Sequence, residues 1–326
     1  MQGNETTARA NANVALVKYW GKRDAKLNLP ATGSVSLTLD ELGVETSVAF
    51  GVTATDVFEL DGAPAADEVA RRLLDFVDLV RADLDERVPV RVRTRAFMPM
   101  GAGLASSAAV FAALALATTR AAGLQLEPRE LSALARRGSG SAARSIFGGF
   151  AEWHRGERSD GMDSVAEPLE FGGDWEVCMV VAIVSTVPKA VSSRAGMQHA
   201  ATSPFYTPWV EGAAADLAEA REAIRAHDLE ALGRVAEHNA LKMHAVGLGA
   251  RPALLYWKGA TVECLRRVWS LRDGGVSAYV TIDAGPQVKV LCTPATSEQV
   301  VVALREVPGV QRVLVCRPGP GARLVA

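Results

Sequence analysis

The spacing of hydrophobic and polar residues predicts a chain of mixed strands and helices. Apolar runs predict strands in the first part of the chain at 9–17, 44–51, 89–97 and 176–184. Apolar residues at helical spacing predict helices between them at about 66–83, 104–120 and 128–137. After Pro188 the pattern predicts helices at about 208–226, 228–244, 258–272 and 296–306, and strands at 277–282, 286–292 and 311–316.

The order of these elements indicates the fold class. Strands and helices come in runs without strict alternation, which favours α+β layers over a doubly wound sheet. We place a domain boundary near residue 185, before the helix-rich segment that follows Pro188. This boundary gives two predicted domains, 1–185 and 186–326.

Composition limits the kinds of function. The 326 residues are 49% hydrophobic and 22% charged, which suits a soluble globular protein with an ample core. Lys and Arg number 35 against 37 Asp and Glu, so the net charge of -2 predicts no binding to nucleic acid or to an anionic membrane. Any bound anion must therefore be held by local groups.

The cysteines and the first residues indicate a compartment. Four single cysteines form no CxxC pair, as expected of reduced cytosolic thiols, and no zinc site is expected. No secretory signal opens the chain, so a cytoplasmic location is expected by default. The most apolar stretch, 103–119, is rich in alanine and predicts a buried helix rather than a membrane span.

Two glycine- and serine-rich segments are candidate anion sites. In "PMGAGLASSAAV", glycines and hydroxyls lie at the start of the predicted buried helix, where free backbone N–H groups bind phosphate. In "GSGSAARSIFGGF", Gly138 and Gly140 allow close backbone approach, and Arg144 returns to the face of Ser141 if a helix starts there. Capped helices, the second with an exposed arginine, are the purely structural alternatives.

Cations follow two apolar strands. Lys18 and Lys22 flank Trp-Gly at the end of the first strand, and Lys189, Ser193 and Arg194 follow the strand at 176–184. Each group alone would be an ordinary solvated surface. Together with the two glycine-rich segments, they indicate a small, highly charged ligand that needs many donors.

"VTIDAGPQVKVLC" places Asp283 at the end of a strand. An aspartate there either opens the Ala-Gly-Pro turn or serves as a base that cations keep ionised. The five histidines form no HExxH or similar ligand set, and His238 and His244 lie on different faces of a predicted helix. We assign the histidines no catalytic role.

Six motifs together resemble one family. "ANVALVKYWGKRD", "GAGLASSAA", "GSGSAARSIFGGFAEW", "VSSRAGM", "HNALKMHA" and "TIDAGP" are similar, in family order across 12–286, to the diphosphomevalonate (mevalonate diphosphate) decarboxylase family of the GHMP kinase superfamily. The resemblance implies a two-lobed α+β fold with mixed and antiparallel sheets, helices packed against them and an active-site cleft between the lobes. The N-terminal lobe would bind ATP, and the C-terminal lobe would complete the substrate site.

The resemblance also implies a reaction. Mevalonate 5-diphosphate would be phosphorylated by ATP with Mg²⁺ at its 3-hydroxyl and would then lose phosphate and CO2, giving isopentenyl diphosphate for isoprenoid synthesis. A homodimer is implied as well. Two rivals stay open: a kinase or decarboxylase acting on mevalonate 5-phosphate or mevalonate, and a nucleotide-binding relic without turnover.

Carried over position by position, the resemblance implies roles for individual residues. Asp283 would be the base at the 3-hydroxyl, and Arg144 would bind the substrate carboxylate. The implied catalytic set is Asp283, Arg144, Lys18 and Ser106. The implied substrate-binding set is Asn13, Tyr19, Lys22, Ser139, Gly140, Ser141, Arg144, Ser193, Arg194 and Met197. The implied ATP-binding set is Gly101, Ala102, Gly103, Leu104, Ala105, Ser106, Ser107 and Lys189, with Ser107 also near Mg²⁺.

The sequence departs from the family pattern at two places. "PMGAGLASS" stands where the family commonly has Pro-Thr-Ala-Ala-Gly, and in "PATGSVS" Gly33 replaces a hydroxyl. Neither departure falls on Asp283 or Arg144. We expect them to affect nucleotide affinity more than the reaction.

Overall fold

The computed structural model describes residues 5–82, 84, 87–97, 106–169 and 175–325, and it has two main sheets. The large sheet has the strand order β14-β1-β4-β7-β5-β6, and β8 and β9 extend it from β4. Its strands are β1 (Thr6–Val17), β4 (Ser34–Phe50), β5 (Val57–Leu60), β6 (Ala63–Pro64), β7 (Val90–Ala96), β8 (Phe150–Trp153), β9 (Ala166–Pro168) and β14 (Arg323–Val325). A separate hairpin pairs β2 (Lys22–Asp24) with β3 (Leu29–Pro30).

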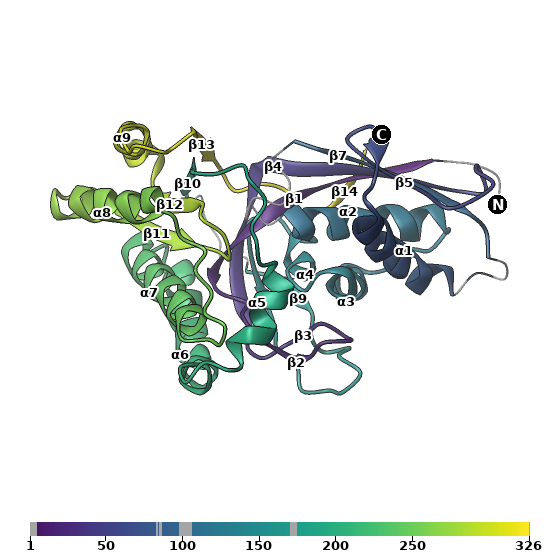
Figure 1. The fold of residues 1–326 in the computed structure, drawn as a ribbon, viewed down its shortest axis with the longest axis horizontal. Helices are drawn as coiled ribbons and strands as arrows, with labels where there is room; N and C mark the ends of the chain where they lie inside the picture. Colours follow the sequence, from purple (N-terminus) through teal and green to yellow (C-terminus); the bar gives the residue numbers. More distant parts are fainter. Residues whose placement is uncertain (1–4, 83, 85–86, 98–105, 170–174, 326) are drawn as a thin grey trace.

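Helices cover one face of the large sheet (Figure 1). They are α1 (Asp67–Arg81), α2 (Ser106–Ala121), α3 (Pro128–Gly138) and the single turn α4 (Ala142–Ser145). Helix α2 packs between β1 and β4 on one side and α3 and α4 on the other, which is why its sequence is apolar all round. The predicted buried helix is confirmed by the complete burial of α2 from Ala108 to Thr119.

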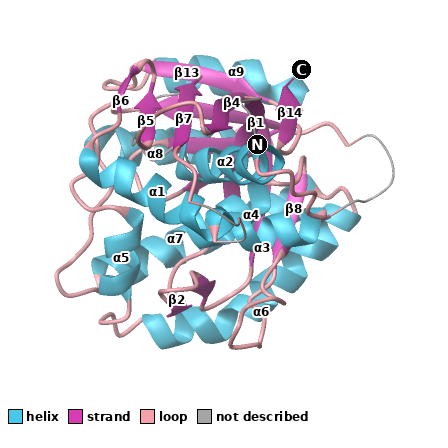
Figure 2. Ribbon diagram, turned by 90° about the vertical axis from the view of Figure 1, so that its right-hand side faces the viewer, coloured by secondary structure: helices cyan, strands magenta, loops and turns pink. Residues whose placement is uncertain are grey.

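The small sheet has the order β11-β12-β10-β13 and is antiparallel throughout. Its strands are β10 (Cys178–Ile183), β11 (Ala278–Ile282), β12 (Val288–Cys292) and β13 (Arg312–Cys316). Helix α7 (Leu229–Leu248) covers one face, and α8 (Gly259–Asp273) and α9 (Pro294–Arg305) cover the other (Figures 1 and 2). Helices α5 (Ser193–Ala200) and α6 (Tyr206–Arg225) complete this half.

Alternate residues of the small sheet enter different cores. Met179 and Val181 of β10 join a core shared with α7 and the large sheet, whereas Val180 and Ala182 join the core under α8 and α9. This alternation follows the two-residue period of a strand. Because α7 contacts both β11 and β1, it links the two sheets.

The predicted α+β class is confirmed, and each predicted strand and helix has an observed counterpart. Strand β4 begins at Ser34 rather than near residue 44, because Asp40 and Glu41 interrupt its apolar pattern. The apolar spacing did not predict α5, a short polar helix, or the short strands of two to four residues. Strand β10 ends at Ile183 and pairs only with strands of the second half; the boundary at 185 stays a prediction.

Candidate active site

Asp283 lies between two buried lysines, directly after β11. Its Oδ1 accepts a hydrogen bond from Lys18 Nζ at 2.8 Å, and its Oδ2 pairs with Lys289 Nζ at 3.1 Å. The lysine side chains are 1% and 0% exposed, but Asp283 keeps 21%. Of these three side chains, only that of Asp283 is therefore partly accessible.

The charges around Asp283 fix its protonation state. Burial alone would raise the pKa of the Asp283 carboxyl, but Lys18 and Lys289 outweigh it and hold that pKa well below its usual range. Burial also lowers the pKa of Lys18 to about 8, although the Asp283 charge opposes this shift. Asp283 is therefore ionised at neutral pH, as the sequence analysis expects of a base among cations.

Arg144 is the second buried charge, and neutral groups hold it. Its Nε and Nη2 donate to Asn13 Oδ1 at 3.1 and 3.0 Å, and its Nη1 donates to Ser34 Oγ. Asn13 Nδ2 in turn donates to Ser141 O at 3.0 Å and to Ser145 Oγ at 2.8 Å. Burial lowers the pKa of Arg144 to about 10, so it stays charged. The structural alternative of an exposed arginine is wrong, because Arg144 is 2% exposed.

A row of hydroxyls joins the two glycine-rich segments. Ser107 Oγ lies 3.2 Å from Ser139 Oγ, which lies 3.4 Å from Ser141 Oγ. Ser106 begins α2 beside this row. The predicted ATP-binding residues Gly101, Ala102, Gly103, Leu104 and Ala105 fall outside the described residues.

The glycines at 138 and 140 have packing partners. A Cβ on Gly138 would lie 2.0 Å from the Phe111 ring, and one on Gly140 would lie 2.7 Å from the Tyr19 ring. The predicted reason for glycine was close approach to a ligand, whereas the observed neighbours are aromatic side chains. Burial raises the pKa of Tyr19, which stays a neutral phenol above Gly140.

Two further lysines, Lys189 and Lys22, are partly buried and hydrogen-bonded. Lys189 Nζ donates to Ser193 Oγ and to the carbonyl of Ala284, both at 2.6 Å, which places it beside the Asp283 turn. Lys22 Nζ donates to Asn28 Oδ1 at 2.6 Å, and burial together with the charges of Arg194 and Arg72 lowers the pKa of Lys22 to about 8. A neighbouring anion would relieve this repulsion.

Met197 and Trp20 belong to an apolar cluster rather than to the polar row. Met197 packs against the cluster that contains Trp20, Trp209 and Met243. Gly33, the departure noted in the sequence, faces Leu217 and the carbonyl of Trp153, where a Cβ would lie 2.9 and 3.2 Å away. Packing therefore explains the glycine at position 33.

Sequence reasoning missed several neighbours of the predicted residues. Lys289 interrupts the apolar run of β12, a signal that was present in "QVKVLC". Asn239 Oδ1 accepts from the backbone N–H of Lys18 at 2.8 Å, and Asn239 Nδ2 donates to Asp216 at 2.6 Å. Arg72 of α1 faces Lys22, and no motif marked it.

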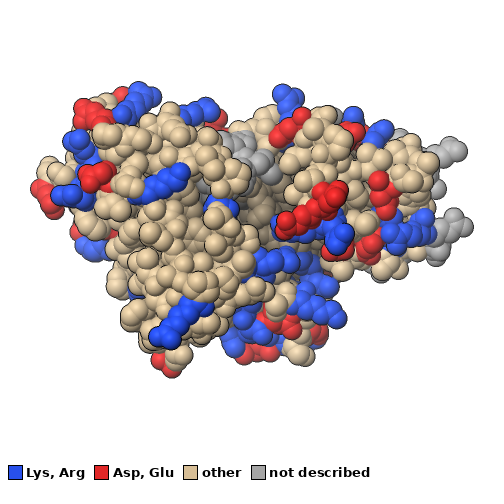
Figure 3. Space-filling view, viewed as in Figure 1, with Lys and Arg blue, Asp and Glu red and all other residues tan. Residues whose placement is uncertain are grey.

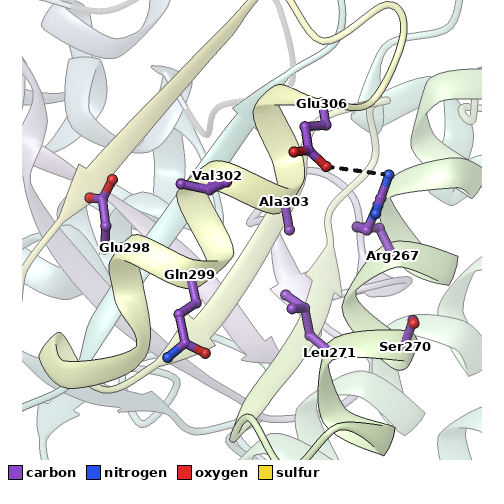
Figure 4. Close-up of a pocket in the computed structure, with 8 residues that line it drawn as sticks. All are labelled: Arg267, Ser270, Leu271, Glu298, Gln299, Val302, Ala303 and Glu306. Carbon is purple, nitrogen blue, oxygen red and sulfur yellow. Dashed lines mark ion pairs between the residues drawn. The ribbon is translucent and has the colours of Figure 1, made fainter.

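The outer surface has a central hollow and, elsewhere, a shallow pocket between α8 and α9. In the space-filling view, the face is hollowed at its centre and Lys and Arg side chains gather below the hollow (Figure 3). A shallow pocket between α8 and α9 contains none of the predicted site residues; it holds the 3.6 Å ion pair Arg267–Glu306 (Figure 4).

Over the described ranges, no three His, Cys, Asp or Glu side chains converge as a metal cluster. Within those ranges no helix has the length and apolar character that crossing a membrane requires.

The fold and the site define a class. Two sheets with covering helices form the two-lobed architecture of the GHMP kinase superfamily, and the site adds a partly exposed carboxylate between two buried lysines. The solved structure described as MDDEF in complex with MVAPP, AMPPCP and magnesium shares this fold, with a TM-score of 0.92, 39% identity and 98% of each chain covered. The mevalonate diphosphate decarboxylase from Enterococcus faecalis, in a structure on mevalonate diphosphate mediated ATP binding, gives 0.91, 39% and 98% of each chain.

Sequence comparison gives the family. Residues 10–166 match the diphosphomevalonate decarboxylase-like N-terminal domain, and residues 179–316 match the mevalonate 5-diphosphate decarboxylase C-terminal domain. Diphosphomevalonate decarboxylase mvd1 of Aspergillus fumigatus is 34% identical over 93% of this chain and 80% of that protein. The chain belongs to the diphosphomevalonate decarboxylase family.

Proposed function

We propose that the protein is an ATP-dependent decarboxylase that converts mevalonate 5-diphosphate into isopentenyl diphosphate, ADP, phosphate and CO2. The observation that carries this proposal is the Asp283 carboxylate, ionised between Lys18 and Lys289 on a side chain that stays partly exposed. Its family relatives act on or bind this substrate by name. The rival of a relic without turnover is disfavoured, because both buried charges are in place.

In the first step, Asp283 accepts the proton of the 3-hydroxyl while the oxygen takes the γ-phosphoryl group from ATP. A carboxylate has about four lone-pair sites, so two lysine contacts leave room for the hydroxyl. A positioned base typically contributes about 10²–10⁴ to the rate. The cations around it favour the charged form of the substrate phosphates.

In the second step, Arg144 orients the substrate carboxylate. The C3–O bond breaks and phosphate leaves with its electron pair, which gives C3 positive character. The bond between C2 and the carboxylate carbon then breaks, its electrons form the C2–C3 double bond, and CO2 departs. Asn13 and Ser34 accept hydrogen bonds from the Arg144 guanidinium, which fixes its position before the substrate carboxylate binds.

The diphosphate of the substrate is assigned to a second group of cations, separate from Asp283 and Arg144. Lys22 and Arg194, with the hydroxyls of Ser139, Ser141 and Ser193, supply the donors, and Tyr19, Gly140 and Met197 supply the walls. This number of donors favours the diphosphate over the monophosphate, because each charged contact is worth about 1.5–3 kcal/mol. Lys189 lies beside Ala284, where it reaches both Ser193 and the reacting region.

The residues present fit ATP with Mg²⁺. The hydroxyl row from Ser107 to Ser141 borders the start of α2, and Ser106 and Ser107 would face the transferring phosphate. Mg²⁺ requires few protein ligands, because it retains waters and binds substrate phosphates, so Ser107 suffices as the protein donor. When bound, Mg²⁺ neutralises charge on the phosphate oxygens.

We further propose a cytoplasmic homodimer with domains at 1–185 and 186–326. The four cysteines are all buried and free, which suits a reducing compartment. The balanced charge of the chain supports no nucleic-acid partner. Light scattering on the purified protein would give its mass, and limited proteolysis would test the domain boundary.

The test of the function is a product balance. Purified protein, Mg-ATP and each of mevalonate, its 5-phosphate and its 5-diphosphate are incubated separately, and ADP and CO2 are measured. We expect both products in equal amounts and only with the diphosphate. ADP without CO2 would make the protein a kinase, and equal or better turnover of the monophosphate would assign it to the rival decarboxylase.

A further inference from the structure

Lys289 reaches Asp283 because of the register of the small sheet. Thr281 of β11 lies opposite Lys289 of β12, and Asp283 follows two residues later on the same face. Lys289 and Asp283 are therefore diagonal neighbours across two antiparallel strands, within reach of a long side chain. Their charged atoms are 3.1 Å apart.

The position of Lys289 would suit an apolar residue. Val288 and Val290 point into the core under α8 and α9, and Leu291 belongs to the core shared with α7. Lys289 itself is 0% exposed. Burying an ammonium group is costly, and an apolar replacement of a buried ion pair is often neutral or stabilising. Folding alone does not account for this lysine.

The two lysines contact different oxygens of the Asp283 carboxylate. Lys18 directly follows β1 and contacts Oδ1, and Lys289 lies in β12 and pairs with Oδ2. Contacts on both oxygens restrict rotation of the carboxylate plane, which one contact would not. The other charged or titratable groups that act on this cluster are Arg144 of α4, His244 of α7 and Lys189 after β10.

We propose that Lys289 is a positioning residue for Asp283, which fixes the orientation of the carboxylate and keeps it ionised so that it can accept the hydroxyl proton. The inference rests on the proposed function and deepens it. The Lys289 side chain is 0% exposed, so its proposed effect on the reaction passes through Asp283.

The experiment compares Lys289→Met with the parent enzyme. We expect kcat with mevalonate 5-diphosphate to fall about 10- to 100-fold, as for loss of a charge-assisted contact, while KM stays within about threefold. The melting temperature should fall, because the variant removes one partner of a buried ion pair, so kinetics are measured at a temperature where both proteins are folded. Both limbs of the pH profile of kcat/KM should move to higher pH, because removing a positive charge raises the pKa of Asp283 and of Lys18.

Two further variants serve as controls. Lys289→Arg keeps the charge and should lose less activity than the Met variant, with both pH limbs near those of the parent. Lys258→Met removes a lysine whose Nζ donates to Ser185 Oγ at 2.8 Å and not to Asp283, and it should leave kcat and the pH profile unchanged. If Lys289→Met cannot be purified folded, Lys289→Gln is measured in its place with the same expectations.

The outcomes separate this inference from the function. An active parent whose Met variant keeps kcat within threefold overturns the role of Lys289 and leaves the function intact. A loss of activity that follows a fall in melting temperature, with unmoved pH limbs, makes Lys289 merely structural and also overturns the inference. A parent that releases no CO2 from mevalonate 5-diphosphate overturns the proposed function and this inference with it.

Discussion

Arg144 and Asp283 are the two charges that the proposed reaction needs most, and the protein holds them by opposite means. Neutral acceptors surround Arg144: the Asn13 amide oxygen and the Ser34 hydroxyl. Charged donors surround Asp283: the ammonium groups of Lys18 and Lys289. Arg144 therefore keeps a full positive charge for a ligand carboxylate, while Asp283 is held ionised on a partly exposed side chain. Binding and proton transfer make different demands on the supporting residues.

The largest expected effect comes from removing the charge of Asp283. Asp283→Asn should fold, bind both substrates and lose about 10²–10⁴ of kcat, because an amide cannot accept the hydroxyl proton. Turnover and direct binding of each substrate are measured on one preparation. Activity within a few-fold of the parent would refute the base assignment.

A matched control for this variant is Asp228→Asn. Asp228 caps α7 by accepting the Ala231 N–H at 2.9 Å, a contact that asparagine can also make. We expect the control to be nearly silent. If Asp283→Asn forms the 3-phosphorylated intermediate but no CO2, Asp283 acts in the second step instead.

The next effect concerns the neutral support of Arg144. Arg144→Lys keeps the charge but cannot reach Asn13 and Ser34 together, so kcat/KM should fall about 10- to 150-fold. The control is Arg136→Lys at another buried arginine, whose Nη1 donates to the Ser164 carbonyl at 2.8 Å. That control should lose stability but keep kcat/KM. An equal fall of kcat/KM in both variants would refute the proposed contact between Arg144 and the substrate carboxylate.

A smaller effect is expected at the exposed cation Arg194. Arg194→Ala should raise KM for mevalonate 5-diphosphate about tenfold or more with little change in kcat, because the diphosphate lies away from the reacting carbon. Steady-state kinetics at saturating ATP measure both constants. An unchanged KM would make Arg194 a surface residue. A fall in kcat alone would move it to the reacting end.

The smallest expected effect is a change in the pH dependence of stability on replacing His244, which lies near Lys18 and Asp283. Burial and the charge of Lys18 lower the pKa of His244 from 6.5 to about 3. Between these values the unfolded chain binds a proton that the folded one does not, so stability falls as pH decreases, by about 1.4 kcal/mol per unit. When the pH falls from 6.5 to 5, the free energy of unfolding of the parent should therefore decrease by about 1–2 kcal/mol more than that of His244→Met, as measured by urea unfolding. Equal slopes would place a protonated His244 in the native state.

Sequence reasoning predicted the elements better than the contacts. Long periodic segments such as α7 and α8 follow from apolar spacing, because each buries one stripe of side chains. Asp283 and Lys18 could be marked as candidates because a charge directly after an apolar strand is conspicuous. Their pairing could not be derived from local pattern, since it depends on how β1 and β11 are brought together by α7.

Other site residues were not predicted, because their position in the sequence pattern fitted a surface role equally well. Lys289 lies in an apolar run where it could equally have been a solvated edge position, and only the strand order shows that β12 is an inner strand. Asn239 and Asp216 lie on helices whose polar residues resemble ordinary surface. Gly138 and Gly140 were predicted to face a ligand, yet Phe111 and Tyr19 occupy the space beside them.

The hydrogen bond between Lys18 and Asp283 joins residues 265 positions apart. Contacts of such long range form late, because the intervening chain must first be ordered. Lys18 emerges early from the ribosome, but its partner emerges only when most of the chain has been made. Catalytic competence is therefore a property of the finished polypeptide. In a refolding experiment, recovery of turnover would follow the recovery of helical signal, so enzymatic activity would time the last stage of assembly.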